Sequence, residues 1–122
     1  MKIPGPDHPI TIKPSSEHIR VTFNGKIVAD TRHALVLQEA AYKPVLYIPR
    51  EDAQMALFER TTNSTHCPYK GDASYYSINA DGRMAENAIW SYETPKSDMT
   101  EIAGYVAFFP NRVDSIEELP VE

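Results

Sequence analysis

The chain has a single cysteine, Cys67, and no long apolar run. One cysteine permits no internal disulfide, so the sequence favours a reducing compartment, and we expect a cytoplasmic protein. No apolar stretch approaches the length of about 18 residues that a membrane-spanning helix needs. The N-terminal residues contain no apolar h-region, so we expect neither secretion by a standard signal nor a membrane partner.

Glycine and positive charge are also scarce. The five glycines lie singly along the chain, which excludes the glycine-rich phosphate loops of P-loop and dinucleotide-binding proteins. The four histidines are scattered and there is no second cysteine, so no metal site is predicted. The net charge of −5 argues against a nucleic-acid partner, because such binders depend on many lysine and arginine contacts with phosphate.

The sequence does contain strong signals for β-strands. Ten prolines among 122 residues favour short strands and loops over long helices. Asn24-Gly25 and Asp81-Gly82 each stand between β-rich runs, and both dipeptides predict tight hairpin turns. Further runs predict strands at 33–40, 45–48, 74–79, 83–93 and 105–109. We therefore expect a mainly β fold (β-rich α+β), with a twisted antiparallel sheet closing toward a small barrel or sandwich.

One short helix is predicted near residues 50–59. Pro49 suits the start of a helix, and Glu51 and Asp52 suit the positive N-terminal end of the helix dipole. A second, single helical turn is expected near residues 98–101, because their spacing is that of a capping box.

The two ends of the chain differ in composition from its middle. Four prolines within residues 1–18 forbid a helix and predict an extended arm, which Ile10 and Ile12 could hold against the domain. Residues 114–122 are acidic and predict a peripheral tail. The length fits a single domain spanning 1–122.

The run Cys67-Pro68-Tyr69-Lys70-Gly71 places a cation three residues after the only cysteine. A nearby cation favours the thiolate form, so Cys67 is a candidate nucleophile with Lys70 as its activator. The alternative is that Cys67 packs as a small buried apolar residue. Lys70 is also a candidate contact for an anionic ligand.

Glu39 and Arg50 are the other charged candidates. Strand alternation places Glu39 on the same face as Leu37, so its carboxylate is expected to point inward as a general base or a ligand-orienting group. Arg50 follows a strand at the start of the predicted helix, where its planar guanidinium suits a carboxylate or phosphate. The alternatives are that Glu39 is solvated or pairs with Arg50, and that Arg50 pairs with Asp52, Glu39 or Glu93.

Aromatic residues predict the walls of a pocket. Trp90 and Tyr92 share one face of their strand with Ala88, and Tyr75 or Tyr76 could face them across the second hairpin; core packing is the alternative. The predicted ligand-binding residues are Arg50, Lys70, Tyr47, Tyr69, Trp90 and Tyr92. The candidate catalytic residues are Cys67, Lys70 and Glu39.

Six motifs follow one another along the chain. They are Gly5-Pro6-Asp7-His8-Pro9-Ile10, Val28-Ala29-Asp30-Thr31, Tyr47-Ile48-Pro49-Arg50-x-Asp52, Cys67-Pro68-Tyr69-Lys70-Gly71, Trp90-Ser91-Tyr92-x-x-Pro95 and Ala107-Phe108-Phe109-Pro110. In this order and spacing, from about residue 4 to 115, the chain resembles the family catalogued as domain of unknown function 427. The resemblance implies a small, mainly β fold and brings a nucleotidyltransferase label. A tyrosine is common in that family where Phe109 stands, so a hydroxyl is not essential at this position.

Three functions are compatible with these residues. We expect first a protein that binds a small anionic metabolite, with Arg50 and Lys70 supplying charge and aromatic side chains supplying the walls. The second is an enzyme, either a thiol enzyme based on Cys67 or a transferase in which Lys70 and Arg50 clamp phosphates. The third is a structural or interaction module without a ligand. The sequence leaves the oligomeric state open.

The transferase alternative alone would require a cofactor. Nucleotidyl transfer commonly uses Mg²⁺ held by paired carboxylates. Asp30, Glu39 and Asp52 could be recruited for this purpose, although nothing in their spacing requires it. Outside this alternative no cofactor is predicted.

Overall fold

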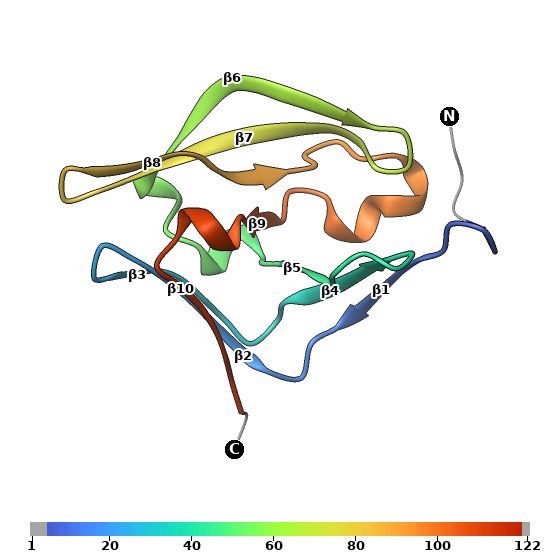
Figure 1. The fold of residues 1–122 in the computed structure, drawn as a ribbon, viewed down its shortest axis with the longest axis horizontal. Coiled ribbons are helices and arrows are strands. Elements are labelled where there is room, and N and C mark those ends of the chain that lie inside the picture. The colour runs from blue at the N-terminus through green and yellow to red at the C-terminus, as the bar shows by residue number, and fades with distance from the viewer. Residues whose placement is uncertain (1–4, 121–122) are drawn as a thin grey trace.

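Antiparallel sheets make up most of the computed structural model, which describes residues 5–120 (Figure 1). The first sheet has the order β1-β4-β5 and consists of β1 (Ile10–Pro14), β4 (Leu35–Glu39) and β5 (Val45–Tyr47). The second has the order β10-β2-β3 and consists of β2 (His18–Phe23), β3 (Lys26–Thr31) and β10 (Ser115–Leu119). The third has the order β6-β7-β8-β9 and consists of β6 (Phe58–Cys67), β7 (Gly71–Ala80), β8 (Arg83–Ser91) and β9 (Val106–Phe108). The mainly β prediction is confirmed, although the sheets of the described residues do not close into a barrel.

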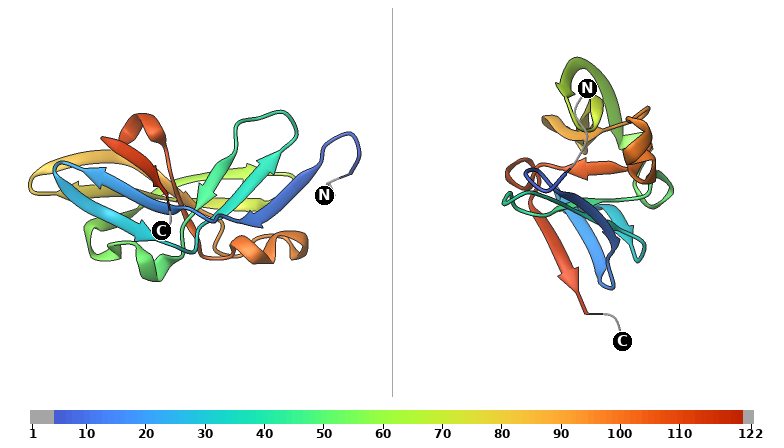
Figure 2. Two further views of the ribbon diagram at one scale, coloured as in Figure 1. Left: turned by 90° about the horizontal axis from the view of Figure 1, so that it is seen from below. Right: turned by 90° about the vertical axis from the view of Figure 1, so that its right-hand side faces the viewer.

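The sheets form two layers. Figure 1 shows β6, β7 and β8 above the two smaller sheets, and Figure 2 shows the β4–β5 hairpin projecting from the body of the molecule beside β1. A backbone bridge between Ile48 and Val106 joins the end of β5 to β9, and so ties the layers together. The sides of β5 and β8 that face each other across this junction form the site described below.

Both predicted hairpin turns are present. Asn24 and Gly25 have φ values of 51° and 77°, and Asp81 and Gly82 have values of 51° and 84°. Positive φ at both central residues is the geometry that Asn-Gly and Asp-Gly tolerate best. These turns join β2 to β3 and β7 to β8.

The predicted helix near residues 50–59 is wrong. The segment contains two separate 3₁₀ turns, η1 (Arg50–Asp52) and η2 (Met55–Leu57), and β6 already begins at Phe58. Ala53 between the turns is extended and bridges Ala29 of β3, while the Gln54 N–H donates to the Val28 carbonyl. Pairing with β3 therefore outweighs the local helix signals, which contribute only tenths of a kcal/mol per residue.

The remaining helical segments are also short. They are η3 (Ser97–Ile102), where a single turn was expected, and η4 (Pro110–Arg112). No helix in the part of the chain that the structure describes is long and apolar enough to cross a membrane.

Both ends of the chain contribute strands within the described residues. Ile10–Pro14 of the predicted arm forms β1 and pairs with β4, and Ile10 and Ile12 pack against a core cluster. Ser115–Leu119 of the predicted tail forms β10 and pairs with β2. The acidic segment is therefore part of a sheet, in which Glu117 and Glu118 are exposed and Ile116 and Leu119 are half-buried.

Buried side chains form two clusters. The larger one lies around Ile19, Val21, Phe23 and Ile78. The smaller one includes Leu37, Tyr47, Ala73, Tyr92, Met99, Ile102 and Ala107. The smaller cluster contains two tyrosines, and these tyrosines also line the pocket described next.

Candidate functional site

Lys70 is held in place by a tight turn between β6 and β7. Gly71 follows it with a φ of 110°, a backbone conformation that residues other than glycine rarely adopt. The Lys70 carbonyl accepts a hydrogen bond of 3.0 Å from the Lys96 backbone N–H. The Lys70 side chain is directed inward and the residue is only 8% exposed, which is rare for a lysine without a partner.

The partner of Lys70 is Glu39, the last residue of β4. The Lys70 ammonium donates to Glu39 Oε1, and Glu39 Oε2 accepts a 2.8 Å hydrogen bond from His8 Nε2. Ala40 then turns the chain with a φ of 47°, and its N–H donates to the Pro9 carbonyl. Burial alone would raise the pKa of Glu39, but the hydrogen bonds from Lys70 and His8 outweigh it and lower the pKa below its ordinary value.

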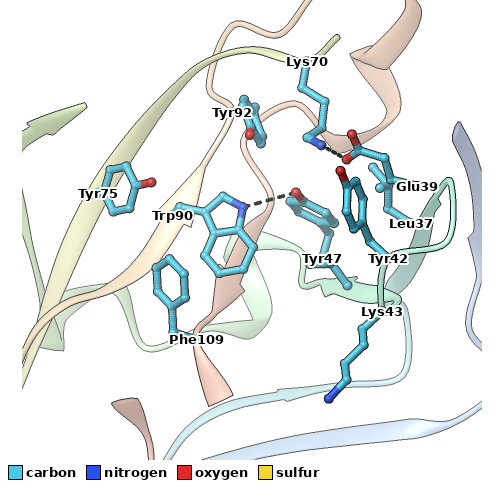
Figure 3. Close-up of a pocket in the computed structure, with 11 residues that line it drawn as sticks. Leu37, Glu39, Tyr42, Lys43, Tyr47, Lys70, Tyr75, Trp90, Tyr92 and Phe109 are labelled. Carbon is cyan, nitrogen blue, oxygen red and sulfur yellow. Dashed lines mark hydrogen bonds and ion pairs between the residues drawn. The ribbon is translucent and has the colours of Figure 1, made fainter. Parts of the chain in front are cut away.

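A pocket of about 240 Å³ opens beside this ion pair (Figure 3). The Trp90 N–H donates a 3.2 Å hydrogen bond to the Tyr47 hydroxyl, which fixes the indole across the pocket. Phe109 lies against the indole with ring centroids 4.4 Å apart. The lining residues are Leu37, Glu39, Tyr42, Lys43, Val45, Tyr47, Lys70, Tyr75, Trp90, Tyr92 and Phe109. Apolar walls with a few placed polar groups are typical of small-molecule sites.

Two phenols and the ammonium of Lys70 face the same space. Figure 3 shows the hydroxyl of Tyr47 turned toward the Lys70 ammonium, while Tyr92 presents its ring to that ammonium. The Tyr47 hydroxyl accepts the Trp90 N–H, so its own proton is available to donate. The Tyr92 hydroxyl has no hydrogen-bond partner among the described residues. Every fully buried side-chain polar atom in that part of the chain does have a partner, so this hydroxyl is not fully buried. The Tyr92 hydroxyl therefore borders the pocket.

Both phenols keep their protons over the ordinary pH range. Burial raises the pKa of Tyr47 to about 12 and raises the pKa of Tyr92 further still. Lys70 can donate three hydrogen bonds, one of which goes to Glu39, and its ammonium lies 5.9 Å from the centre of the Tyr92 ring. The site therefore presents donors that suit the oxygen atoms of an anion.

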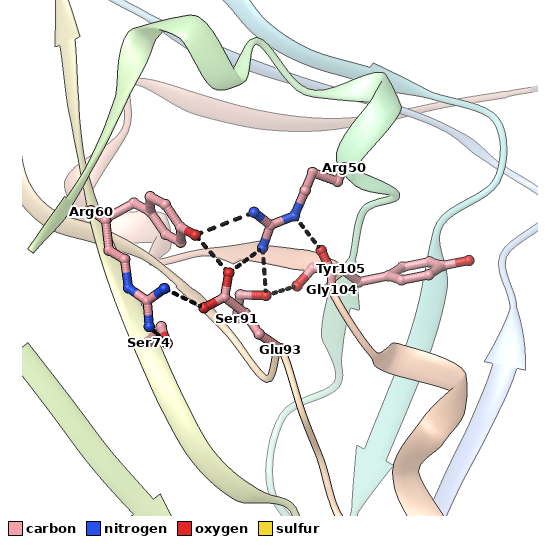
Figure 4. A network of polar contacts seen from close by, with 8 residues as sticks. Arg50, Arg60, Ser74, Ser91, Glu93, Gly104 and Tyr105 are labelled. Atoms are coloured by element: carbon pink, nitrogen blue, oxygen red, sulfur yellow. Dashed lines mark hydrogen bonds and ion pairs between the residues drawn. The ribbon is translucent and has the colours of Figure 1, made fainter.

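Arg50 lies outside this pocket, in a separate polar network (Figure 4). Its guanidinium donates to the Gly104 carbonyl at 2.9 Å, to the Tyr76 hydroxyl at 3.2 Å and to Glu93 Oε2 at 3.1 Å. It also donates to the Ser91 hydroxyl at 3.2 Å. The prediction that Arg50 and Lys70 line one pocket is therefore wrong, and of the partners considered for Arg50 the structure selects Glu93.

One family model matches almost the whole of the described chain. The family model described as a domain of unknown function, DUF427, and named NTP_transf_9, matches residues 11–119. The chain belongs to this family. No curated protein matches the chain. All residues that line the pocket of this DUF427 chain fall inside the matched segment.

The DUF427 chain does not direct Cys67 into the pocket. Cys67 ends β6 and packs, half-buried, against the smaller core cluster. Its neighbour His66 turns outward and bonds Asp72 at 2.7 Å. Tyr69 stacks on the His8 ring with centroids 4.0 Å apart and is not among the pocket-lining residues. The position of Cys67 matches the alternative in which it packs as an apolar residue.

The three carboxylates considered for Mg²⁺ have separate partners in this DUF427 chain. Asp30 bonds His18 and Arg20, and Asp52 accepts a 2.7 Å hydrogen bond from Thr31. Glu39 is paired with Lys70. Among residues 5–120, no group of three or more His, Cys, Asp or Glu side chains is placed to hold a metal ion.

Several pocket residues of the DUF427 chain were not expected from sequence. Tyr42 and Lys43 reach the pocket only because Ala40 adopts a left-handed turn after β4, and no local signal marks that turn. Tyr75 lies opposite Trp90 in the β7–β8 ladder, one of the two arrangements considered. Phe109 completes the wall between them.

Proposed function

We propose that this DUF427 protein binds a small anionic molecule in the pocket between β5 and β8. A carboxylate or phosphate group would accept hydrogen bonds from Lys70, Tyr47 and Tyr92, and the body of the molecule would lie against Trp90 and Phe109. The proposal takes the protein to be cytoplasmic, because its one cysteine can form no internal disulfide.

The observation that carries this proposal is the set of donors without acceptors. Glu39 takes one donor of Lys70 and neutralises its charge. The Tyr47 proton and the Tyr92 hydroxyl have no acceptor among the described residues. Leaving such groups without partners in a partly desolvated site is unfavourable, and an anionic oxygen would satisfy both phenols and a second proton of Lys70.

A thermal-shift screen with isothermal titration tests the proposal. The probes are acetate, succinate, inorganic phosphate, sugar phosphates, and nucleoside triphosphates with and without Mg²⁺. A ligand at 100 times its dissociation constant adds about 2.7 kcal/mol, which corresponds to a shift of about 10 °C for a chain of this size. Lys70→Met should abolish the shift. A requirement for Mg²⁺ would favour the transferase alternative.

The matched control is Lys26→Met, which removes an exposed lysine paired with Asp81 outside the pocket. It should bind like the wild type. The proposal is wrong if no acid produces a shift, or if a shift survives unchanged in Lys70→Met.

A further inference from the structure

A second hollow adjoins the pocket on the other side of Trp90. It has a volume of about 290 Å³, and Val45 and Trp90 line both spaces. Its lining residues are Val21, Pro44, Val45, Leu46, Ile48, Trp90, Phe108, Pro110 and Ile116. We call this hollow the apolar groove. The two spaces therefore meet along the indole and one valine.

The apolar groove offers a ligand no polar side-chain contact. Every lining side chain is a hydrocarbon except that of Trp90, whose N–H is already bonded to Tyr47. Leu46 and Ile116 are half-buried, and Pro44 and Pro110 are exposed. A polar molecule in the groove would find only backbone groups to replace its hydrogen bonds to water. An aliphatic group would instead remove this apolar surface from water.

Together the two spaces form one site with opposite chemistry at its ends. We propose that the ligand is amphipathic, with its acidic group at Lys70 and an aliphatic chain that passes over Trp90 into the apolar groove. This inference rests on the proposed function and adds the class of ligand. A hollow of about 290 Å³ lined by nine residues has room for a section of a small molecule, whereas a stable protein–protein interface takes roughly 20–30 residues on each side.

A homologous series of straight-chain acids tests the inference. Acetate, butanoate, hexanoate and octanoate differ only in chain length and are titrated below their micelle-forming concentrations. Once the chain is long enough to pass Trp90, each further methylene should lower the dissociation constant about fourfold, as expected for burial of one CH₂. The wild-type affinity should therefore rise steeply over the longer members.

Variants of the groove separate the two ends of the site. Ile116→Ser should flatten the dependence on chain length and leave the affinity for acetate unchanged. Ile27→Ser is the matched control, because Ile27 is an exposed isoleucine outside both spaces. Pro44→Asp places a charge at the exposed edge of the groove, and it replaces Ile116→Ser if that variant fails to fold.

The outcomes distinguish the two proposals. Binding of acids that needs Lys70 but is independent of chain length would overturn the amphipathic ligand and leave the proposed function standing. Equal binding of octanoate by wild type and Lys70→Met would also overturn it, because the acidic end would then contribute nothing. If no straight-chain acid of any length binds, the amphipathic ligand is overturned, whereas the proposed function fails only if the phosphates of the screen do not bind either.

Discussion

Two ion pairs lie on opposite sides of residues 90–93, which form the end of β8 and the two positions after it. Trp90 and Tyr92 face the pocket and the Lys70–Glu39 pair, while Ser91 and Glu93 face Arg50. On the Arg50 side, four of the five guanidinium N–H groups have an acceptor among the described residues. The Lys70 side has spare donors and an adjoining hollow. Charge and partial burial are common to both pairs, so the proposal of a binding site at Lys70 rests on its unused donors beside an open space.

The polar network around Arg50 has a structural role. Arg50 connects the segment after β5 to Gly104 and Glu93, which stand in the connection between β8 and β9. Ser91 extends the network, because its hydroxyl donates a 2.7 Å hydrogen bond to the Tyr105 carbonyl. Arg60, which is in β6, lies 3.1 Å from the second carboxylate oxygen of Glu93. The network thus links the segment after β5 to the β6-β7-β8-β9 sheet, in addition to the backbone bridge between Ile48 and Val106.

Arg50→Met should have the largest effect on stability. We expect the free energy of unfolding to fall by about 2 kcal/mol, because the Gly104 carbonyl loses its arginine donor and Glu93 and Tyr76 each lose one hydrogen bond. The expected loss lies below the roughly 3–5 kcal/mol of fully buried pairs, since about a third of the Arg50 side chain is exposed. Urea denaturation measures the change, and acid binding at the pocket should be retained.

Arg60→Met is the control for this prediction. Arg60 contacts the same carboxylate, but its side chain is 62% exposed, and exposed pairs contribute less than about 1 kcal/mol. Arg50→Lys should recover little stability, because an ammonium cannot reproduce the forked geometry of the guanidinium. Equal losses in Arg50→Met and Arg60→Met would contradict the distinction between a half-buried connector and a surface contact.

The sequence predicts the hairpin turns and the aromatic wall of the site better than it predicts the register in which the strands pair. The two hairpins follow from Asn24-Gly25 and Asp81-Gly82, whose backbone preferences act locally. Unbroken pairing from the second turn would put Tyr75 opposite Ala88, whereas an irregularity near Asn87 puts it opposite Trp90. The aromatic wall could therefore be expected, but its register depends on a bulge that no local signal marks.

Arg50 and Lys70 illustrate why the site could be predicted only in part. Both stand in motifs with glycine or proline neighbours and both have half-buried carboxylate partners. Which side of the protein each charge faces depends on long-range pairing, in particular the bridge between Ala53 and Ala29 that breaks the predicted helix. Contacts between segments this far apart leave no periodic pattern in the sequence.

Acidification should weaken both ion pairs. Burial would raise the pKa of Glu93, but hydrogen bonds from Tyr76 and Ser74 and the charges of Arg60 and Arg50 lower it below its ordinary value of 4.5. Glu39 is lowered in the same direction. A carboxylate with a lowered folded pKa stabilises the protein above its unfolded pKa, and that contribution is lost as pH falls through the folded pKa.

Urea midpoints measured between pH 6 and pH 2 test this expectation. The free energy of unfolding should decrease once the pH drops below about 4.5, because carboxylates of the unfolded chain begin to bind protons there. Glu93→Gln and Glu39→Gln should each be less stable than wild type at pH 6 and lose less on acidification. A wild-type slope that neither variant reduces would assign the acid sensitivity to other carboxylates.

Removal of a single hydroxyl on each side gives the smallest and most direct contrast. Tyr76→Phe should lower the free energy of unfolding by about 1 kcal/mol, because the Tyr76 hydroxyl donates to Glu93 at 2.7 Å and accepts from Arg50. It should not change acid binding. Tyr92→Phe should change the stability by less than about 0.5 kcal/mol, because its hydroxyl has no partner among the described residues.

For Tyr92→Phe the expected loss is in affinity. A hydrogen bond to a charged acceptor contributes about 1.5–3 kcal/mol, so the dissociation constant for the best acid of the screen should rise at least tenfold. Tyr105→Phe is the matched control, since Tyr105 lies outside both the pocket and the apolar groove. If Tyr76→Phe weakened binding and Tyr92→Phe weakened folding instead, the roles of the two sides would be reversed. The two pairs of measurements together therefore decide which face of this strand binds and which one supports the fold.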